Sequence, residues 1–250
     1  MKIAAIMAGG MDGPIESGQI CEVIAQRGGT CEWFYRRNGD QLPECIDAYD
    51  ALIVFGGEIS VHDSSLKSYF DELALFIHKF AEQRKPILGS CLGSQAIAYA
   101  FDAEVMPQGF LEYGFTKLAL TEEGKCDPLL AGLPSESQLF EMHSDTFELP
   151  KGATLLMSGS AIQNQVYRLG ELIYGFQCHF EVSPEIVDTW NRRELIGNPS
   201  QDQDQINILI TKAEQDFVRY QPAQRAFGDA VVNRWLNLIN TQQGMEENVI

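Results

Sequence analysis

A cysteine lies at the centre of a short glycine-rich segment that could carry nucleophilic chemistry. Residues 89–93 read GSCLG, between an apolar run ending at Leu88 and a helix-like stretch over 94–101. Small residues two positions either side of a nucleophile permit a sharp strand–turn–helix elbow, which lifts the side chain above a sheet. The positive end of the following helix favours a thiolate. The pattern predicts that Cys91 is a nucleophile, although a core thiol beside a glycine-rich turn would have the same local sequence.

A histidine and a glutamate with complementary chemistry follow in the segment QCHFE, residues 177–181, at the end of another apolar run. His179 could accept the thiol proton and later donate a proton to a leaving amine. Glu181 lies two positions further, on the same side of an extended chain, where it could hold the imidazole in one tautomer. A lone histidine would more simply be structural. Together with the elbow, the segment predicts a Cys91–His179–Glu181 triad.

A third segment could stabilise negative charge that develops on a substrate oxygen. Residues 55–58 read FGGE and end the buried apolar run that begins at Ala51. A backbone N–H from such a loop can form an oxyanion hole together with the N–H of the residue after the nucleophile. We therefore assign Gly57 and Leu92 to this role, although the glycines would equally serve a plain turn before a helix.

The elements that must position these residues predict an α/β fold. Apolar runs favour strands, and apolar spacings of three and four favour helices. The first hundred residues alternate the two, with strands expected at 2–7, 31–35, 51–55 and 87–89 and helices at 16–27, 65–82 and 94–101. This alternation predicts an open, mostly parallel, doubly wound sheet with helices on both faces.

The second half of the chain has a different texture. It is strand-rich at first, with candidate strands at 115–120, 137–142, 153–158, 162–168 and 172–178. Ser183 and Pro184 then predict a helix start, because serine caps a helix and proline suits its first position. Two amphipathic helices are expected near 203–219 and 222–240. We expect a catalytic domain over 1–190 and a helical extension over 191–250 that packs on it.

The composition and net charge indicate which kinds of binding partner to expect. The 250 residues carry a formal net charge of −17, which repels polyphosphate backbones and anionic membranes, so neither nucleic acid nor a membrane is expected as a partner. No apolar run approaches the roughly 20 residues of a membrane span. The six cysteines form no Cys-x-x-Cys pair or zinc spacing, which predicts reduced thiols in a cytoplasmic protein and no metal site.

Taken together, the segments GSCLGSQ (89–95) and QCHFE (177–181) resemble the signatures of class I (triad) glutamine amidotransferases. They are most similar to the glutaminase domain of GMP synthases and its stand-alone relatives. The segments 55–61 and 142–150 resemble those relatives as well. The resemblance implies a flavodoxin-like architecture, no cofactor, and hydrolysis of glutamine to glutamate and ammonia through a γ-glutamyl thioester on Cys91.

The resemblance also implies residues that bind the substrate. Gln95 corresponds to a family residue near the bound glutamine, and Gly114-Phe115 to a backbone segment that recognises its amino-acid part. A second substrate-side segment comprises His143, Ser144 and Asp145.

Two departures from the family pattern concern the site itself. The usual His-Pro-Glu is here His179-Phe180-Glu181, and the proline commonly found after the glycine pair is replaced by Glu58.

Three functions remain open from the sequence. The first is an amidotransferase-like enzyme acting on glutamine, either alone or with a separate synthase subunit that accepts the ammonia. The second is a γ-glutamyl peptidase with the same triad and a peptide substrate. The third is a non-catalytic binding or regulatory module that has kept the fold. No Walker loop or dinucleotide fingerprint indicates an acceptor-activating domain, which favours a self-sufficient hydrolase or peptidase.

Overall fold

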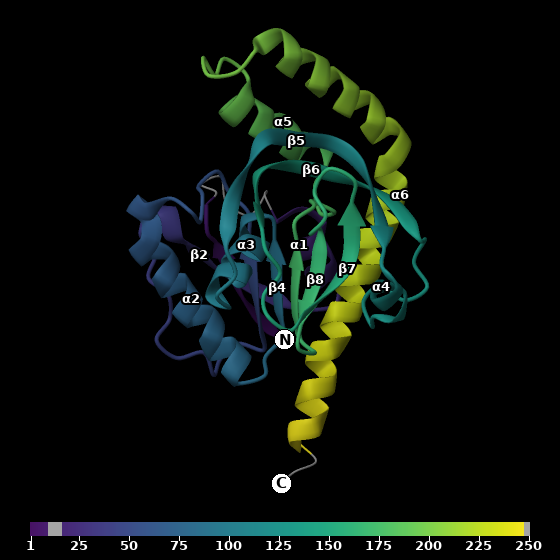
Figure 1. The fold of residues 1–250 in the computed structure, drawn as a ribbon. Helices are drawn as coiled ribbons and strands as arrows, with labels where there is room; N and C mark the ends of the chain where they lie inside the picture. The colour runs from purple at the N-terminus through teal and green to yellow at the C-terminus, as the bar shows by residue number, and fades with distance from the viewer. Residues whose placement is uncertain (10–16, 248–250) are drawn as a thin grey trace.

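A computed structural model describes residues 1–9 and 17–247, with side chains described up to residue 240 (Figure 1). Within these residues, nine strands form a single sheet in the order β2-β1-β3-β4-β9-β8-β7-β5-β6. The strands are β1 (Lys2–Met7), β2 (Thr30–Tyr35), β3 (Ala51–Phe55), β4 (Ile87–Ser90), β5 (Val105–Leu120), β6 (Glu136–Phe147), β7 (Ala153–Gly159), β8 (Val166–Leu169) and β9 (Ile173–Phe176).

The α/β class is confirmed, and the sheet is mixed. Strands β2, β1, β3, β4 and β9 pair in parallel, whereas β9, β8, β7, β5 and β6 pair antiparallel. Parallel neighbours need a long crossover, usually a helix. Between β5 and β9 the described chain offers only the five-residue helix α4 (Glu122–Cys126). These strands therefore fold back on one another, and only the half-sheet that carries the elbow is parallel.

Helices cover both faces of the parallel half-sheet. They are α1 (Gly18–Gln26) and the second half of α6 (Gln203–Glu247) on one face, and α2 (Lys67–Glu82) and α3 (Leu92–Ala100) on the other, whereas α5 (Pro184–Trp190) lies against the β5–β6 strands. Alternate residues of β1 point to opposite faces. Ile3 and Ala5 join the core beneath α1 and α6, whereas Ala4 and Ile6 join the core beneath α2 and α3. A third apolar cluster lies between the β5–β6 hairpin, α5 and the first half of α6.

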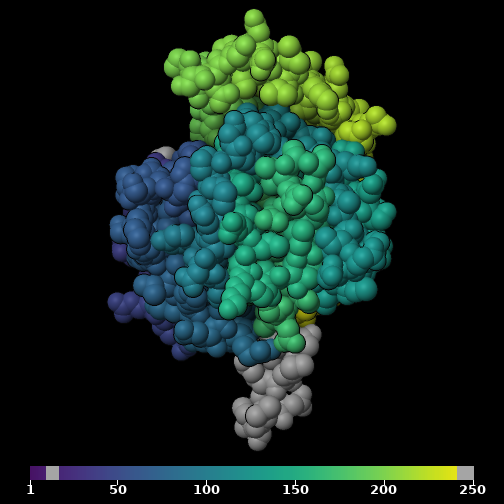
Figure 2. Space-filling model, viewed as in Figure 1, coloured from purple at the N-terminus to yellow at the C-terminus, as the bar shows by residue number. Residues whose placement is uncertain are grey.

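The C-terminal segment differs from its prediction. In place of two helices at 203–219 and 222–240, α6 is one helix that contains Pro222 and changes direction along its length (Figure 1). Proline removes the bond to the carbonyl four residues earlier. Here that carbonyl belongs to Val218, which is 86% exposed, so water can satisfy it and the helix continues. The first half of α6 and the turn before it form a cap over one end of the molecule (Figure 2).

Smaller differences concern where elements begin. Strand β8 starts at Val166 rather than at residue 162, and β5 and β6 are much longer than the strands expected at 115–120 and 137–142. Residue 16, the expected start of the first helix, lies outside the described residues. None of the described helices combines the length and apolar character needed to span a bilayer.

Candidate active site

The elbow at Cys91 has the strained backbone that its sequence predicts. Cys91 has φ 50° and ψ −112°, in a left-handed region that costs a non-glycine residue about 1–3 kcal/mol. Its N–H donates to the carbonyl of Phe176 in β9 at 2.7 Å, and its carbonyl accepts from the N–H of Ser94 at 2.8 Å. The residue is thus held between the end of β4 and the first turn of α3.

Two glycines allow the close approaches that this elbow needs. A Cβ on Gly93 would lie 1.8 Å from the carbonyl oxygen of Val54, so only glycine lets α3 start against β3. A Cβ on Gly56 would lie 3.4 Å from Cβ of Cys91 and 3.5 Å from Cε1 of His179. A side chain at that position would therefore fill the space beside the cysteine and the histidine.

His179 and Glu181 meet Cys91 from the segment after β9. The N–H of His179 donates to the carbonyl of Phe140 in β6 at 2.7 Å, which fixes the backbone. Nδ1 of His179 lies 2.9 Å from Oε1 of Glu181, and the same oxygen accepts a hydrogen bond from Oγ of Ser90 at 2.8 Å. His179 and Glu181 are each 3% exposed. The structure thus brings the three predicted triad residues together.

The electrostatics of His179 favour its charged form. Burial alone lowers the pKa of its imidazole, but the adjacent Cys91 and Glu181 outweigh burial and raise the pKa well above its ordinary value. The ring also makes an edge contact with Trp190 at a centroid distance of 4.8 Å. A buried imidazolium next to a sulfur and a carboxylate is the arrangement that supports a reactive thiolate.

A cleft of about 470 Å³ opens above Cys91. Gly57 and Leu92, predicted as oxyanion donors, both line it. Leu92 is the first residue of α3, where the N–H has no intrahelical partner and remains available. Glu58 also lines the cleft and pairs with Arg37 at 3.5 Å, so a cation accompanies the acid that replaces the usual proline.

Four predicted substrate residues line the same cleft: Gln95, His143, Ser144 and Asp145. The amide of Gln95 donates to Oε1 of Gln177 at 2.9 Å and to the Asp145 carbonyl at 3.4 Å. In turn, the Gln177 amide lies 3.6 Å from the Cys91 sulfur. Gln95 therefore orders the wall of the cleft, whereas the exposed Ser144 is the freest of the four to contact a ligand.

The side chain of Asp145 is already engaged by the loop after β3. It accepts a hydrogen bond from Oγ of Ser60 and lies 3.1 Å from Nε2 of His62. These contacts tie the open end of the β5–β6 pair to the loop that carries Gly57. Asp145 therefore shapes the mouth of the cleft.

The structure places Gly114 and Phe115 away from the cleft. Phe115 is 7% exposed and packs against Phe140, Phe217 and Tyr220 in the third apolar cluster. Neither residue lines the cleft that contains Cys91. The long β5 strand carries Leu111 to the cleft instead, because the irregular pairing of β5 with β6 between Pro107 and Glu112 changes which residues reach it.

A buried charge cluster lies beneath the cleft. Nε2 of His143 lies 3.1 Å from Glu112 and 3.2 Å from Glu141, and Nδ1 bonds the Asp145 carbonyl at 2.9 Å. Burial lowers the pKa of His143, but the two glutamates raise it to about 10. Burial raises the pKa of Glu141 to about 7.

Among the described residues, Glu112, Glu141 and His143 form the one group whose donor atoms converge closely enough to hold a metal ion. The two glutamates favour the protonated form of His143. We therefore interpret the cluster as an ion-pair network that supports the hairpin beside the cleft.

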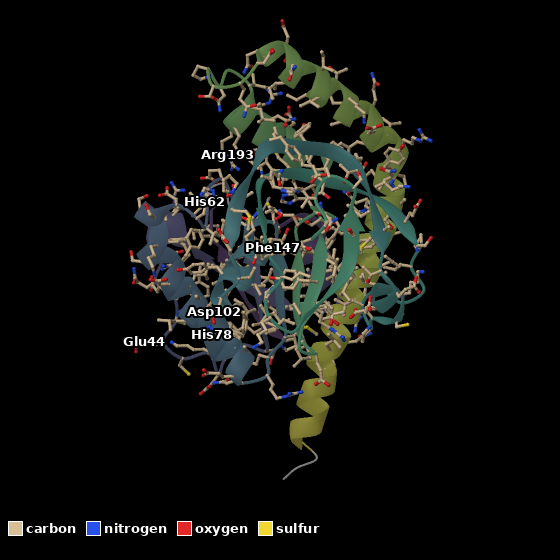
Figure 3. All side chains as sticks on the ribbon, viewed as in Figure 1. Glu44, His62, His78, Asp102, Phe147 and Arg193 are labelled. Carbon is tan, nitrogen blue, oxygen red and sulfur yellow. The ribbon has the colours of Figure 1, made fainter. Side chains whose placement is uncertain are left out.

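The C-terminal segment contributes residues to the cleft that the sequence did not indicate. The lining includes Arg193, Glu194, Leu195, Asn198 and Gln201, which follow α5 in a π-helical turn (Asn191–Leu195) and the loop after it. Arg193 projects from this segment toward the body of the protein (Figure 3) and donates to Glu194 at 2.7 Å. Polar residues in an irregular segment have no periodicity that could have identified them. Ser90 and Gln177, by contrast, lie inside the recognised segments.

Cys91 on a strand–turn–helix elbow of a parallel half-sheet, with His179 and Glu181 buried beside it, is an arrangement that could carry thiol chemistry in an α/β protein. The chain belongs to the class I glutamine amidotransferase family, whose model (Glutamine amidotransferase class-I) matches residues 16–196. The resemblance stated from the sequence is thereby confirmed.

Individual relatives agree with this membership. The chain is 35% identical over 175 residues to the glutamine amidotransferase-like protein YfeJ of Salmonella typhimurium, covering 69% of this chain and 73% of that protein. It is 32% identical to a GMP synthase [glutamine-hydrolyzing] of Porphyromonas gingivalis over 64% of this chain but only 29% of the synthase. The crystal structure of a glutamine amido transferase from Methylobacillus flagellatus has the same fold, with a TM-score of 0.78 at 24% identity, covering 95% of this chain and 94% of that one.

Proposed function

We propose that this chain hydrolyses the γ-amide of glutamine, or a related γ-glutamyl amide, through a thioester on Cys91. The observation that carries the proposal is the position of His179, whose ring lies beside Cys91 and contacts the Glu181 carboxylate, while Cys91 itself lines a cleft. Family membership supports the reaction class. A cytoplasmic setting suits the reaction, because a reduced thiol persists there.

Each residue has a defined part in the proposed reaction. The Cys91 sulfur attacks the γ-carbonyl carbon while His179 holds the thiol proton. The N–H groups of Gly57 and Leu92 bind the resulting oxyanion. His179 then protonates the leaving nitrogen, so the C–N bond breaks and ammonia or an amine departs. Water, deprotonated by His179, attacks the thioester, releasing glutamate and restoring the thiol. Glu181 keeps the imidazole oriented and stabilises its charge.

The test is turnover of the purified chain on glutamine and on a panel of γ-glutamyl dipeptides, with glutamate and ammonia both measured. We expect glutamate from at least one substrate and none from Cys91→Ala. Absence of glutamate from every substrate, together with no labelling of Cys91 by a γ-glutamyl diazoketone, would refute the proposal. The non-catalytic module would then be the better interpretation.

A γ-glutamyl peptidase is the second candidate, and the size of the cleft favours it. Its volume of about 470 Å³ lies within the roughly 300–1,000 Å³ typical of sites for drug-sized ligands. It continues from Cys91 to Arg193 and Gln201, which leaves room for a group beyond the scissile amide. A peptidase would release glutamate without ammonia from γ-glutamyl dipeptides, and faster than it would from glutamine.

An ammonia-accepting partner is the remaining alternative for an amidotransferase. One relative, 31% identical over 61% of this chain, is a subunit of a GMP synthase [glutamine-hydrolyzing] from Thermoplasma acidophilum. We favour a hydrolase that works alone, because the chain's own C-terminal segment already covers part of the cleft. Negligible turnover alone that is restored by a co-purifying synthase would reverse this preference.

A further inference from the structure

The residue between the histidine and the glutamate connects the site to the C-terminal helix. Phe180, which replaces the proline usual in the family, is 1% exposed. Its ring packs edge-on against Phe176 of β9 at 4.9 Å and tilted against Phe227 of α6 at 6.0 Å. A Cβ added to Gly228 would lie 3.2 Å from the Phe180 ring. Helix α6 therefore packs closely on the Phe180 ring through Phe227 and Gly228.

A buried glutamine on the same helix bonds the backbone on both sides of the catalytic pair. Gln224 is 1% exposed. Its carbonyl oxygen accepts from the N–H of Phe140 at 2.9 Å, and its amide donates to the carbonyl of Val182 at 3.2 Å. Phe140 is the residue whose carbonyl accepts from the N–H of His179, and Val182 directly follows Glu181. One side chain thus holds both backbones that set the spacing of the pair.

Helix α1 completes the attachment from the other side. The N–H of Gln19 donates to the carbonyl of Glu181 at 2.9 Å. The Gln19 side chain donates to Asp229 at 2.7 Å and to the carbonyl of Arg225 at 2.6 Å. The backbone around Glu181 is therefore bonded to α6 directly and also through α1. These α6 residues all lie beyond residue 196, where the family match ends.

We propose that α6 is a positioning element for the catalytic pair, with Gln224 as its central positioning residue and the Phe180–Phe227 contact as its apolar support. The expected changes in kcat and KM rest on the proposed function. The expected change in the reactivity of the Cys91 thiol does not. Only glutamine supplies a donor and an acceptor in one side chain of this length. Neither Gln224 nor Phe227 lines the cleft, so the effect of α6 falls on the geometry of the reacting groups and not on substrate contacts.

The expected effect follows from displacement of His179. In Gln224→Leu, a buried N–H and a buried carbonyl lose their partners, and the segments around Phe140 and Val182 must shift to find others. A misplacement of about 1 Å at a reacting group costs about 100-fold in rate. We therefore expect kcat to fall by about 10- to 100-fold while KM stays within about twofold. Gln215→Leu, the same change at an exposed position of α6, should leave both constants unchanged.

A substrate-independent measurement separates this proposal from the proposed function. The rate of alkylation of Cys91 by iodoacetamide, followed across pH by peptide mass spectrometry, reports how well His179 stabilises the thiolate. For Gln224→Leu we expect a slower rate at neutral pH and a profile whose midpoint moves to higher pH, because a displaced His179 accepts the thiol proton less readily. A purely structural role would lower the melting temperature without moving that midpoint. A wild-type alkylation profile in folded Gln224→Leu would overturn the proposal even if the enzyme proves to hydrolyse γ-glutamyl amides.

A second variant keeps the proposal testable if Gln224→Leu does not fold. Gln224→Met keeps the length of the side chain, and nearly its volume, but removes both the acceptor for the Phe140 N–H and the donor to the Val182 carbonyl. Its alkylation profile should shift in the same direction as that of Gln224→Leu. An unshifted profile in this variant would also overturn the proposal.

Discussion

Replacing Glu181 by glutamine would test the central link of the proposed triad with little change in shape. Oε1 of Glu181 accepts from His179 at 2.9 Å and from Ser90 at 2.8 Å. Hydrogen bonds to a charged group contribute about 1.5–3 kcal/mol, and about 1.4 kcal/mol changes a rate tenfold. The amide oxygen can still accept from Ser90 but stabilises the imidazolium less. We therefore expect kcat to fall by about 10- to 150-fold.

The pH dependence of the same variant provides an independent check. Glu181 contributes to the raised pKa of His179, so the pKa falls when the carboxylate is removed. Because the imidazolium is the favoured resting form, the alkaline limb of the kcat–pH profile should move to lower pH. Glutamate release measured across pH tests both expectations. Glu171→Gln is the matched control, since that side chain is 75% exposed and forms a surface ion pair with Arg84.

The outcome that would refute this reasoning is a folded Glu181→Gln protein with the wild-type kcat and pH profile. Thermal unfolding would establish that the variant is folded. Such a result would mean that Ser90 and the surrounding packing orient His179 without the carboxylate.

Three further predictions concern the elbow and the buried charge cluster. A γ-glutamyl diazoketone should label Cys91 alone, and peptide mapping that places the label on Cys178 would disprove the assigned nucleophile. Gly93→Ala puts a methyl 1.8 Å from the Val54 carbonyl oxygen; overpacking should lower the free energy of unfolding by about 3 kcal/mol and abolish turnover, and an unchanged melting temperature would contradict this packing. Glu141→Gln should stabilise the protein more at about pH 8 than at about pH 4. Burial raises the Glu141 pKa from 4.5 to about 7, so its contribution to stability is present below 4.5 and is lost as pH rises through 7. Equal effects in urea unfolding at both pH values would argue against a buried, protonated Glu141.

Local residue chemistry made much of this protein predictable. The tight approach at Gly93 and the strained turn at Cys91 require small neighbours, and that requirement is visible as GSCLG in the sequence. Continuous apolar runs predicted β1, β3 and β4 because strands buried on both faces must be apolar throughout. These features depend on short stretches of chain, so a single sequence reports them directly.

Other features depend on contacts between residues far apart in sequence, and in these the structure differs from what the sequence indicated. The antiparallel half of the sheet follows from the lack of long crossovers between β5 and β9, which apolar runs do not reveal. Two helices were expected near 203–219 and 222–240, yet one helix runs through Pro222, where the preceding Val218 is exposed. Phe115 is buried in the apolar cluster that includes residues of α6 and does not line the cleft.

The sequence by itself determined the chemistry available to this protein: a cysteine on an elbow, a histidine and glutamate two residues apart, and the family they indicate. Tertiary structure alone decided how those groups are held. The bond from Phe140 to His179, the engagement of Gln224 with Val182, and the entry of Arg193 into the cleft each join segments that are distant in sequence. Residue type and spacing report what a side chain can do, whereas its partner is set by the folding of the whole chain.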